Sequence, residues 1–361
     1  MPPIQPSNIE INNEVNQQPF KKEVKDKKEK PNILLKEKEI KVEESFRPQN
    51  LDDYIGQEKL KKIINIRISA AIKRGDPASF GHCLLYGPPG LGKTSCAFLI
   101  GQLLSAKVHI LSAPALEKPK DIIGILLSVS KGDVVFIDEI HRLNKISEEL
   151  LYPVLEDFCL DFSTGKGNTA KINRIALPKF IMIGATTKLG SLSAPLRDRF
   201  THIHHLEYYS EEEIAQIISR TSKILNYNLT HEGALIIAQR SRKTPRIANR
   251  ICRLVRDYLS HKECSIANVD IVEEALNLYE IDKFGLDSID RKILKAINEN
   301  YAGGPVGLET LSASIAEDPK TLEDFYEPFL LQEGLLERTS KGRKISQKAL
   351  DLIEKNIIKL T

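Results

Sequence analysis

The sequence predicts an α/β fold, a parallel sheet with flanking helices, followed by a small all-α domain and a third domain of short helices. Three observations support this prediction. Short apolar runs alternate with helical patterns in the first half of the chain, a glycine-rich loop follows the first apolar run, and beyond Leu206 helical patterns take over. With 361 residues, 41% of them hydrophobic, the chain is long enough for two or three domains.

Composition argues against several classes of protein. Lys and Arg total 52 against 49 for Asp and Glu, so a nucleic-acid partner would need a local basic patch rather than the net charge of +3. No apolar run approaches the roughly 18 residues of a membrane helix, and no secretory signal is expected. The five scattered cysteines form no CxxC pair, which argues against a disulfide scaffold or a zinc module and favours reduced thiols in a cytoplasmic protein.

Residues 1–45 differ from the rest of the chain. They are rich in Asn, Gln, Lys and Glu, and nine Lys balance nine acidic residues. Such a stretch buries too little apolar surface to offset the entropy of ordering, so we predict a disordered extension. A basic arm is the alternative, which the equal number of acids disfavours.

The elements are predicted in order from periodicity and breakers. Apolar spacing predicts a helix over 57–74, which Gly75, Asp76 and Pro77 end. The sheet is expected from buried strands at His82–Tyr86, Asp133–Ile137 and Phe180–Gly184, with a helix at Thr94–Leu104. Later helices are expected at Glu211–Lys223, Gly233–Ser241, Pro245–Ser260, Asn268–Tyr279, 287–300, 308–316 and 319–332, before a hairpin-like segment Gly334–Ser346. The predicted domains are 46–206, 207–279 and 280–361.

The loop Gly87–Thr94 reads GPPGLGKT, the pattern GxxxxGK[ST] between a predicted strand and a predicted helix. Glycines let successive backbone N–H groups point into one concavity that binds phosphate oxygens, and the helix N-terminus adds positive potential. Lys93 is expected to reach the β- and γ-phosphates, and the Thr94 hydroxyl to ligate Mg²⁺. A glycine-rich turn with a chance lysine is the alternative, which this context disfavours.

Two carboxylates, Asp138 and Glu139, end the apolar strand at Asp133–Ile137. Open α/β sheets bind ligands at the carboxyl edge of the strands, where a cation is expected beside such a pair. We expect Asp138 to hold the Mg²⁺ shell and Glu139 to orient and deprotonate the attacking water. A solvated strand end is the alternative.

Polar and cationic residues elsewhere could complete this site. Thr186 and Thr187 end the third strand, where a hydroxyl could touch the γ-phosphate or the water. Arg197 and Arg199 flank one Asp on a loop, which suggests one arginine held internally and one free to act on a neighbour's nucleotide. Arg246 opens a helix of the all-α domain and could reach the γ-phosphate. Surface ion pairs are the alternative for both kinds of arginine.

Two hairpins are predicted outside the core pattern. Alternating apolar runs flank Gly165–Asn168, which predicts a hairpin at 159–178 inserted between the second and third strands. Near the C-terminus, Arg338, Lys341, Arg343 and Lys344 cluster on the second hairpin. The preceding helix carries Glu323, Asp324 and Glu327 and would be repelled by a DNA groove. We therefore predict sequence-independent contact of this hairpin with the DNA backbone, with a solvated charged hairpin as the alternative.

Taken together, these stretches resemble the AAA+ ATPases and, more narrowly, the RuvB family of bacterial Holliday-junction branch-migration motors. The resemblance runs from about residue 45 to the C-terminus, whose helices and hairpin resemble a winged helix. It rests on these stretches: Arg47-Pro48 through Gln57, Gly87–Thr94, Phe136–Leu143, Leu151–Pro153, Gly184–Thr187, Pro195–Phe200, Thr244–Arg250 and Gly303–Leu308.

The resemblance implies roles for individual residues. Lys93, Thr94 and the following Ser95 belong to the nucleotide loop with Gly87, Gly90 and Gly92, and Asp138 and Glu139 form the second acidic motif. Arg199 is implied as the finger acting in trans, Arg246 as the lid residue at the γ-phosphate, and Thr186 and Thr187 as the sensor stretch. Further nucleotide contacts are implied for Phe46, Arg47, Glu156, Asp157, Phe158 and Tyr209.

The sequence departs from the family pattern at four positions. Ser95 replaces a usual Thr and keeps the hydroxyl, whereas Phe158 replaces a usual Tyr and loses one. Lys188 replaces a usual Arg and keeps charge without the planar fork, and Pro319 replaces an Arg expected near DNA.

The function implied is an ATP- and Mg²⁺-dependent motor that migrates Holliday junctions during recombination and repair, as a homohexameric ring on duplex or four-way-junction DNA. The resemblance also implies RuvA as a partner at hairpin 159–178, the resolvase RuvC as a further partner, and no membrane. Two alternatives stay open: a clamp-loader-like ATPase switch, and a winged-helix regulator whose ATPase domain controls only assembly.

Overall fold

The computed structural model describes residues 45–164, 171–355 and 358. The contacts divide the chain into two units, 1–47 and 48–361, and the second unit contains the sheet and the helices of all three predicted domains. The predicted extension at 1–45 lies almost entirely outside the described residues. None of the described helices is long and apolar enough to cross a membrane.

A five-stranded parallel sheet forms the centre of the first domain, with strand order β2-β3-β6-β1-β7. Its strands are β1 (Cys83–Tyr86), β2 (Val108–Ser112), β3 (Val134–Asp138), β6 (Ile181–Thr186) and β7 (His202–His205). The three strands predicted as buried are confirmed, and they lie together at the centre of the sheet. The outer strand β2 was not predicted, because it is partly exposed and lacks a continuous apolar run.

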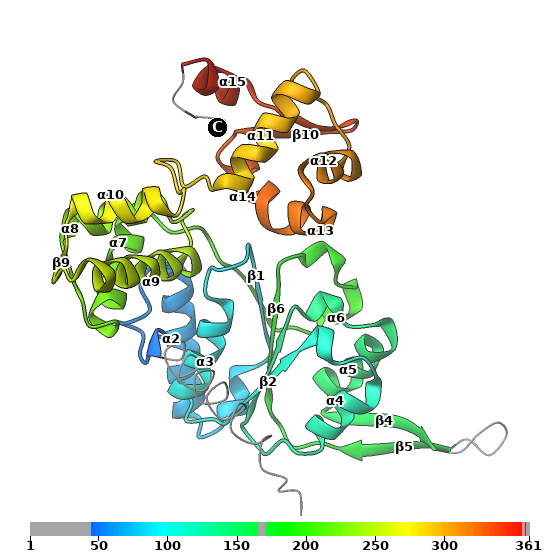
Figure 1. Cartoon of the computed structure of the whole chain (residues 1–361). Helices are drawn as coiled ribbons and strands as arrows, with labels where there is room; N and C mark the ends of the chain where they lie inside the picture. The colour runs from blue at the N-terminus through cyan, green and yellow to red at the C-terminus, as the bar shows by residue number, and fades with distance from the viewer. Residues whose placement is uncertain (1–44, 165–170, 356–357, 359–361) are drawn as a thin grey trace, which may run out of the picture. The chain divides into compact units, whose positions relative to one another are not determined.

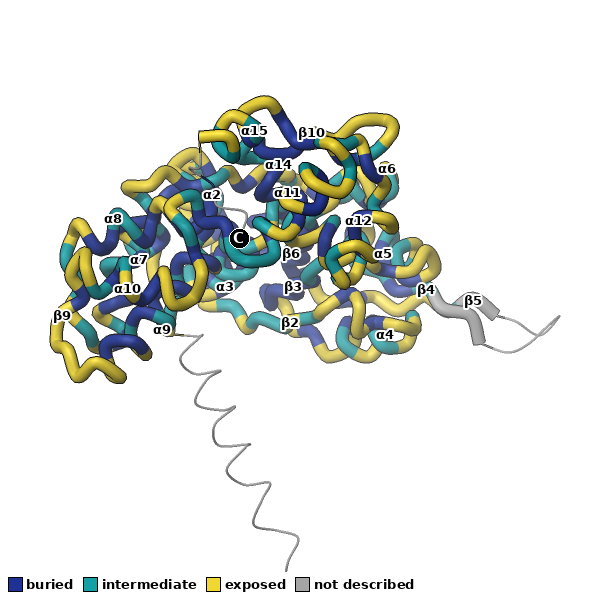
Figure 2. The backbone as a smooth tube through the Cα atoms, turned by 45° about the horizontal axis from the view of Figure 1, so that its top comes forward, coloured by how far each residue is buried: buried dark blue, intermediate teal, exposed yellow. Residues whose placement is uncertain are grey.

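Helices cover both faces of this sheet (Figure 1). On one side lie α2 (Glu58–Lys73) and α3 (Lys93–Leu103), and on the other α4 (Pro119–Leu126), α5 (Lys145–Asp157) and α6 (Ala194–Asp198). The core strands β3 and β6 are buried along their whole length except at the end of β3 (Figure 2). Each Å² of apolar surface that is removed from water stabilises the fold by about 25 cal/mol. This burial makes the sheet a rigid frame for the loops at its carboxyl edge.

The predicted inserted hairpin is confirmed in its strands, β4 (Cys159–Thr164) and β5 (Lys171–Ala176), which pair antiparallel. Both project away from the sheet beside α5 (Figures 1 and 2). Asp161 and Arg174 form a two-point ion pair across the strands, with both N–O distances 2.7 Å. The turn predicted at Gly165–Asn168 lies outside the described residues.

The second domain contains four helices, as predicted: α7 (Glu211–Ile224), α8 (His231–Gln239), α9 (Pro245–Lys262) and α10 (Val269–Leu278). A capping box at Ser210 and Glu213 starts α7, which explains the sharp onset of the helical pattern. The prediction that this domain is all-α is wrong in one detail. The two-residue strands β8 (Asn228–Leu229) and β9 (Ile266–Ala267) pair in parallel, and they are too short to leave a periodic signal.

The third domain has its own apolar core, which includes Leu294, Leu311, Leu330 and Leu336. Its elements are α11 (Ser288–Asn300), α12 (Leu308–Ile315), α13 (Pro319–Thr321), the π-helical segment Leu322–Tyr326, α14 (Glu327–Gln332), β10 (Leu336–Thr339), β11 (Gly342–Ile345) and α15 (Gln347–Glu354). The single helix predicted over 319–332 is therefore interrupted by a π-helical turn. The antiparallel hairpin β10–β11, hereafter the wing, is confirmed.

Candidate functional site

The phosphate loop Gly87–Thr94 joins β1 to α3 at the carboxyl edge of the sheet. Gly87, Gly90 and Gly92 all have positive φ, at 144°, 83° and 93°. At Gly87 a Cβ atom would lie 2.7 Å from the Leu206 carbonyl oxygen, so this position requires glycine. The backbone thus forms the concave path that a phosphate cradle needs.

Lys93 is the buried cation of this loop, with only 7% of its surface exposed. Its Nζ donates to the carbonyl oxygens of Gly87 and Pro88 at 2.8 and 2.9 Å. Burial lowers the pKa of Lys93, and the negative charges of Glu139 and Asp138 partly oppose that shift. A buried ammonium held only by carbonyl dipoles is ready to exchange them for a phosphate.

The two carboxylates at the end of β3 differ in backbone conformation. Asp138 is the last residue of β3, whereas Glu139 has a left-handed backbone with φ 50°. Burial raises the pKa of Asp138, and the charge of Glu139 raises it further. A nearby cation is the group that would return Asp138 to its ordinary ionisation.

The sensor stretch contacts Glu139 directly. The Thr187 hydroxyl donates to Glu139 Oε2 at 3.1 Å, and His141 Nδ1 lies 3.2 Å from the same oxygen. Thr186, fully buried, shares a hydrogen bond of 2.9 Å with His141 Nδ1 and accepts one from the Lys188 amide. His141 was not predicted as a site residue, because its position within Phe136–Leu143 carries no signal of which face it occupies. Its Nδ1 thus lies beside both the Glu139 carboxylate and the Thr186 hydroxyl.

The all-α domain reaches the phosphate loop through the start of α9. The Arg246 amide donates to the Gly90 carbonyl at 3.4 Å, and a Cβ at Gly90 would lie 3.0 Å from Arg246 Cβ. The exposed Arg246 side chain is close enough to lower the pKa values of both Lys93 and Asp138. Its placement agrees with the expectation that it acts on the γ-phosphate, which stays a prediction.

Tyr209 lies beneath the phosphate loop. It is 4% exposed, and its hydroxyl donates to the Leu91 carbonyl at 3.2 Å. The structure thus gives Tyr209 a supporting role for the loop, and the implied contact with adenine stays a prediction. Phe46 and Arg47 belong to the first unit, so their implied contacts stay predictions too. Ser95 lies half-buried in the first turn of α3.

The structure does not bring Arg199 to the phosphate loop of its own chain. Its guanidinium donates to the carbonyls of Tyr152 and Pro195 at 3.2 and 2.7 Å and pairs with Glu156 at 2.8 Å. It also stacks on the Tyr152 ring at 4.7 Å. Arg199, implied as the free finger, is thus held by groups of its own chain in this structure. Its action on a neighbour's nucleotide stays a prediction. A role for Arg199 at a nucleotide requires a second subunit.

The stretch Glu156–Phe158 is also remote from the phosphate loop of the same chain. Phe158 packs against His82 and Phe180, with ring centroids 5.5 and 5.9 Å apart. His82 and Phe180 directly precede β1 and β6, at the amino ends of these parallel strands. The phosphate loop lies at the opposite edge of the sheet, where the strands end. The fold thus places Phe158 away from the phosphate loop of its own chain, and its implied nucleotide contact stays a prediction. Glu156 and Asp157 are exposed, and Glu156 pairs with Arg199.

The wing differs from its expected arrangement at Arg343. This arginine is 7% exposed and donates twice to Glu327 Oε2, at 3.1 and 2.8 Å. Arg338 pairs with Glu323 at 2.7 Å but is exposed, and Lys341 and Lys344 are exposed. Two of the three acids predicted to repel a DNA groove, Glu323 and Glu327, thus hold the wing. Arg343 is corrected from a DNA contact to a structural ion pair.

Replacing Arg343 with alanine is expected to lower the free energy of unfolding by about 3 kcal/mol, because the buried Glu327 would lose both of its short hydrogen bonds. It would keep only the longer contact with Arg338, at 3.6 Å. Urea unfolding of the full chain measures this change. Lys344→Ala, which removes an exposed charge from the neighbouring position, is the control and should leave the midpoint unchanged. An unchanged midpoint for Arg343→Ala would contradict the structural role.

The residues present fit a bound nucleotide and a divalent cation. The loop offers the glycine-lined cradle and the buried Lys93, and Asp138 offers a carboxylate close to the start of α3, where Thr94 lies. Hydroxyl and carboxylate oxygens are the ligands that a hard cation prefers.

Sequence comparison matches three consecutive segments of the chain to one family. Residues 46–206 match the profile described as the Holliday junction DNA helicase RuvB P-loop domain. Residues 209–282 match the RuvB AAA lid domain, and residues 283–354 the RuvB C-terminal winged helix domain.

Individual relatives agree with this match. The chain is 52% identical over 316 residues to the Holliday junction branch migration complex subunit RuvB of Rippkaea orientalis, which covers 88% of this chain and 87% of the relative. It is 51% identical over 301 residues to the subunit of the same name in Synechocystis, covering 83% of each chain.

Solved structures extend the likeness to three dimensions. The Thermotoga maritima RuvB Holliday junction branch migration motor superimposes with a TM-score of 0.77 at 45% identity, covering 86% of this chain and 98% of that one. With the phosphate loop, the acidic strand end, the lid and the wing all in place, this chain belongs to the RuvB family of AAA+ ATPases that drive Holliday-junction branch migration.

Proposed function

We propose that this protein hydrolyses ATP with Mg²⁺ to migrate four-way DNA junctions together with a RuvA partner. The observation that carries the proposal is the meeting of Lys93, Asp138, Glu139 and the sensor residue Thr187 at one sheet edge, with Arg246 of the lid closing over it. The relatives named as branch migration subunits support the choice of DNA substrate. The cytoplasm is the compartment in which we place this activity.

The phosphates lie along the glycine cradle in this mechanism. Lys93 exchanges its two carbonyl partners for phosphate oxygens, and Arg246 neutralises charge from the lid side. Thr94 and Asp138 would hold Mg²⁺, which would neutralise charge on the phosphates when bound. Glu139, fixed by Thr187 and His141, accepts the proton of the attacking water.

A neighbouring subunit completes the site in a ring, for which we propose six copies. Arg199 stabilises the charge that develops on the neighbour's phosphate, as an arginine finger does. Its partner Glu156 is 61% exposed at the side chain, and Asp157 is exposed beside it. Release of Arg199 from Glu156 is the change that delivers the finger across the interface.

RuvA is proposed to bind the inserted hairpin 159–178. The hairpin projects from the sheet domain (Figure 1). Ile175 on β5 is 37% exposed. An apolar side chain on a projecting hairpin is suited to docking in a partner's groove. The resolvase RuvC is proposed as a further partner of the assembled complex.

The proposal is tested by the ATPase rate of the purified protein with and without four-way-junction DNA and RuvA. We expect stimulation by the two together, accompanied by conversion of the junction into separated duplex products. Unchanged hydrolysis and an intact junction would contradict the proposal.

The wing is proposed to contact the DNA backbone through its exposed cations, Lys341 and Lys344, with Arg338 beside them. We expect Lys341→Ala combined with Lys344→Ala to weaken binding equally for all sequences and to lower the slope of log affinity against log salt by about 2, close to one unit per lost phosphate contact. Fluorescence anisotropy titrations across salt concentrations measure it.

The matched control removes the same charge from the same domain. Lys292→Ala with Lys295→Ala takes two exposed cations from α11, which is outside the wing, and should leave the salt slope as it was. A slope that is unchanged in the wing variant as well would refute the contact with the backbone.

A further inference from the structure

Arg242 is a buried cation between the lid and the winged-helix domain. It lies in the turn between α8 and α9, is 7% exposed, and has a left-handed backbone with φ 53°. Its guanidinium donates to the Gly285 carbonyl at 3.1 Å and to the carboxylates of Asp287 and Asp290 at 3.0 and 2.5 Å. It also lies 4.4 Å above the Phe329 ring. Every one of these partners lies beyond the last lid helix.

The acceptors of Arg242 are themselves fixed. Asp287 is the N-cap of α11, and Asp290 is fully buried and accepts the Asp287 amide at 2.9 Å. Burial raises the pKa of Asp290, and the charge of Arg242 opposes that rise. The backbones also approach closely, since a Cβ at Gly285 would lie 2.8 Å from the Arg240 carbonyl oxygen. This packing leaves little room for the two domains to slide.

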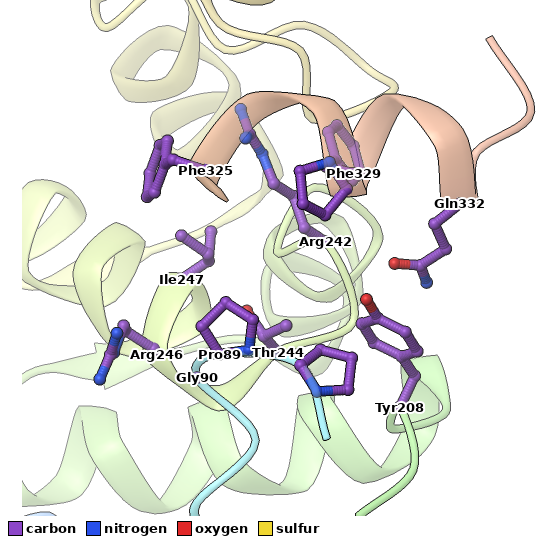
Figure 3. Close-up of a pocket in the computed structure, with 12 residues that line it drawn as sticks. Pro89, Gly90, Tyr208, Arg242, Thr244, Arg246, Ile247, Phe325, Phe329 and Gln332 are labelled. Carbon is purple, nitrogen blue, oxygen red and sulfur yellow. The ribbon is translucent and has the colours of Figure 1, made fainter. Parts of the chain in front are cut away.

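The turn that carries Arg242 leads into the start of α9, which contacts the phosphate loop. Tyr209 donates its amide to the Lys243 carbonyl at 3.3 Å, and Arg246 donates its amide to Gly90. Figure 3 shows Arg242 directed toward the helical segment that carries Phe329, while Arg246 lies beside Gly90. A displacement at the phosphate loop therefore reaches Arg242 through four residues of chain.

The other ion pairs of the winged-helix domain with the rest of the described chain are more exposed. Lys243 and Glu333 are 3.5 Å apart with 44% and 27% of the side chains exposed, and Lys188 and Asp324 are 3.0 Å apart with 51% and 41% exposed. Such pairs contribute little to stability. The Lys188–Asp324 pair joins the sheet domain to the winged-helix domain, so it can break as the lid moves. The Arg242 contacts are buried and resist breaking.

We infer that Arg242 is a positioning residue that joins the lid and the winged-helix domain into one mechanical body. Movement of Arg246 during ATP hydrolysis then moves the wing as well, because no flexible linker between the two domains absorbs it. The transmission of movement during ATP hydrolysis rests on the proposed motor function. The rigid connection between the two domains is a property of the fold alone.

The test compares Arg242→Lys, which keeps the charge but loses the fork, and Asp287→Asn with a matched control. The control is Arg240→Lys, because Arg240 is a buried arginine of the same turn whose carboxylate partner, Glu273 at 2.6 Å, lies on α10 inside the lid. Spin labels are placed on the exposed Cys264 of the lid and on Lys295→Cys of α11, in a Cys159→Ser background. Pulsed electron paramagnetic resonance gives the distance distribution, and a junction assay gives ATP consumed per junction migrated.

We expect a narrow distance distribution for the unaltered chain and for Arg240→Lys. Arg242→Lys and Asp287→Asn should broaden it and raise the ATP consumed per junction by about fivefold or more, with basal hydrolysis retained. If Arg242→Lys fails to fold, Asp287→Asn, with its 21% exposed carboxylate, decides the question alone.

A narrow distribution in these variants, or a broad one with unchanged ATP consumption, would overturn the inference. If the unaltered protein migrates no junction at all, the proposed function fails. The distance distributions then decide the rigid connection by themselves, so the two failures are distinguishable.

Discussion

Replacement of Glu139 by glutamine is expected to leave ATP binding intact and to slow hydrolysis by about 10²-fold or more. The amide has the size of the carboxylate and can still accept the hydrogen bond that Thr187 donates to Glu139 Oε2 at 3.1 Å. It cannot accept a proton from water. Nucleotide binding is measured by equilibrium titration with a fluorescent ATP analogue, and hydrolysis by phosphate release.

The control for this prediction is Glu149→Gln. Glu149 is an exposed carboxylate on α5, 3.9 Å from Lys145, and its loss should leave both measurements unchanged. Near-normal turnover of Glu139→Gln would remove Glu139 as the base. Lost binding would instead indicate that the carboxylate serves the metal, the role that we assign to Asp138.

Mixing Arg199→Ala subunits with Lys93→Ala subunits is expected to restore part of the ATPase activity that each lacks alone. Each variant by itself should lose about 10³-fold or more, since one lacks the finger and the other the phosphate lysine. At equal amounts, half of the subunits keep Lys93 and half keep Arg199, so about a quarter of the interfaces in a closed ring are complete. Phosphate release across a series of mixing ratios measures the recovery.

The physical reason is the position of Arg199. Its contacts within the described part of the chain are to Tyr152, Pro195 and Glu156, on α5 and α6, and none is to the phosphate loop. A subunit carrying both substitutions, mixed with Lys93→Ala subunits, should restore nothing. Arg197→Ala, two positions away, should stay active alone. Absence of recovery at every ratio would count against a site shared between subunits.

Much of the fold follows from local sequence. The strands β1, β3 and β6 are buried on both faces and read as continuous apolar runs, so their positions could be predicted within a residue or two. The phosphate loop is equally local, because its chemistry depends on glycines and a lysine at fixed spacing. Elements without such a signal, such as the edge strand β2 and the two-residue strands β8 and β9, depend on neighbours that sequence does not display.

The pairing of charges within the third domain could not be predicted from the sequence. The sequence shows the basic cluster at 338–344 and the acids at 323–327, but it does not show which of them form ion pairs. Arg343 and Glu327 lie 16 positions apart and meet only because the wing packs against α14, with 9% and 1% of the side chains exposed. Alternation along a strand places Arg343 inward and Lys344 outward, which decides which cation can reach DNA.

By itself, the sequence determined the family, the order of the domains and the nucleotide chemistry, since these depend on residues adjacent along the chain. Only the tertiary structure decided that Arg199 turns away from its own nucleotide loop, that His141 lies beside Glu139, and that Arg242 links the lid to the winged-helix domain. Each of these depends on groups brought together from distant elements, and burial and hydrogen bonding, not spacing, select the partner.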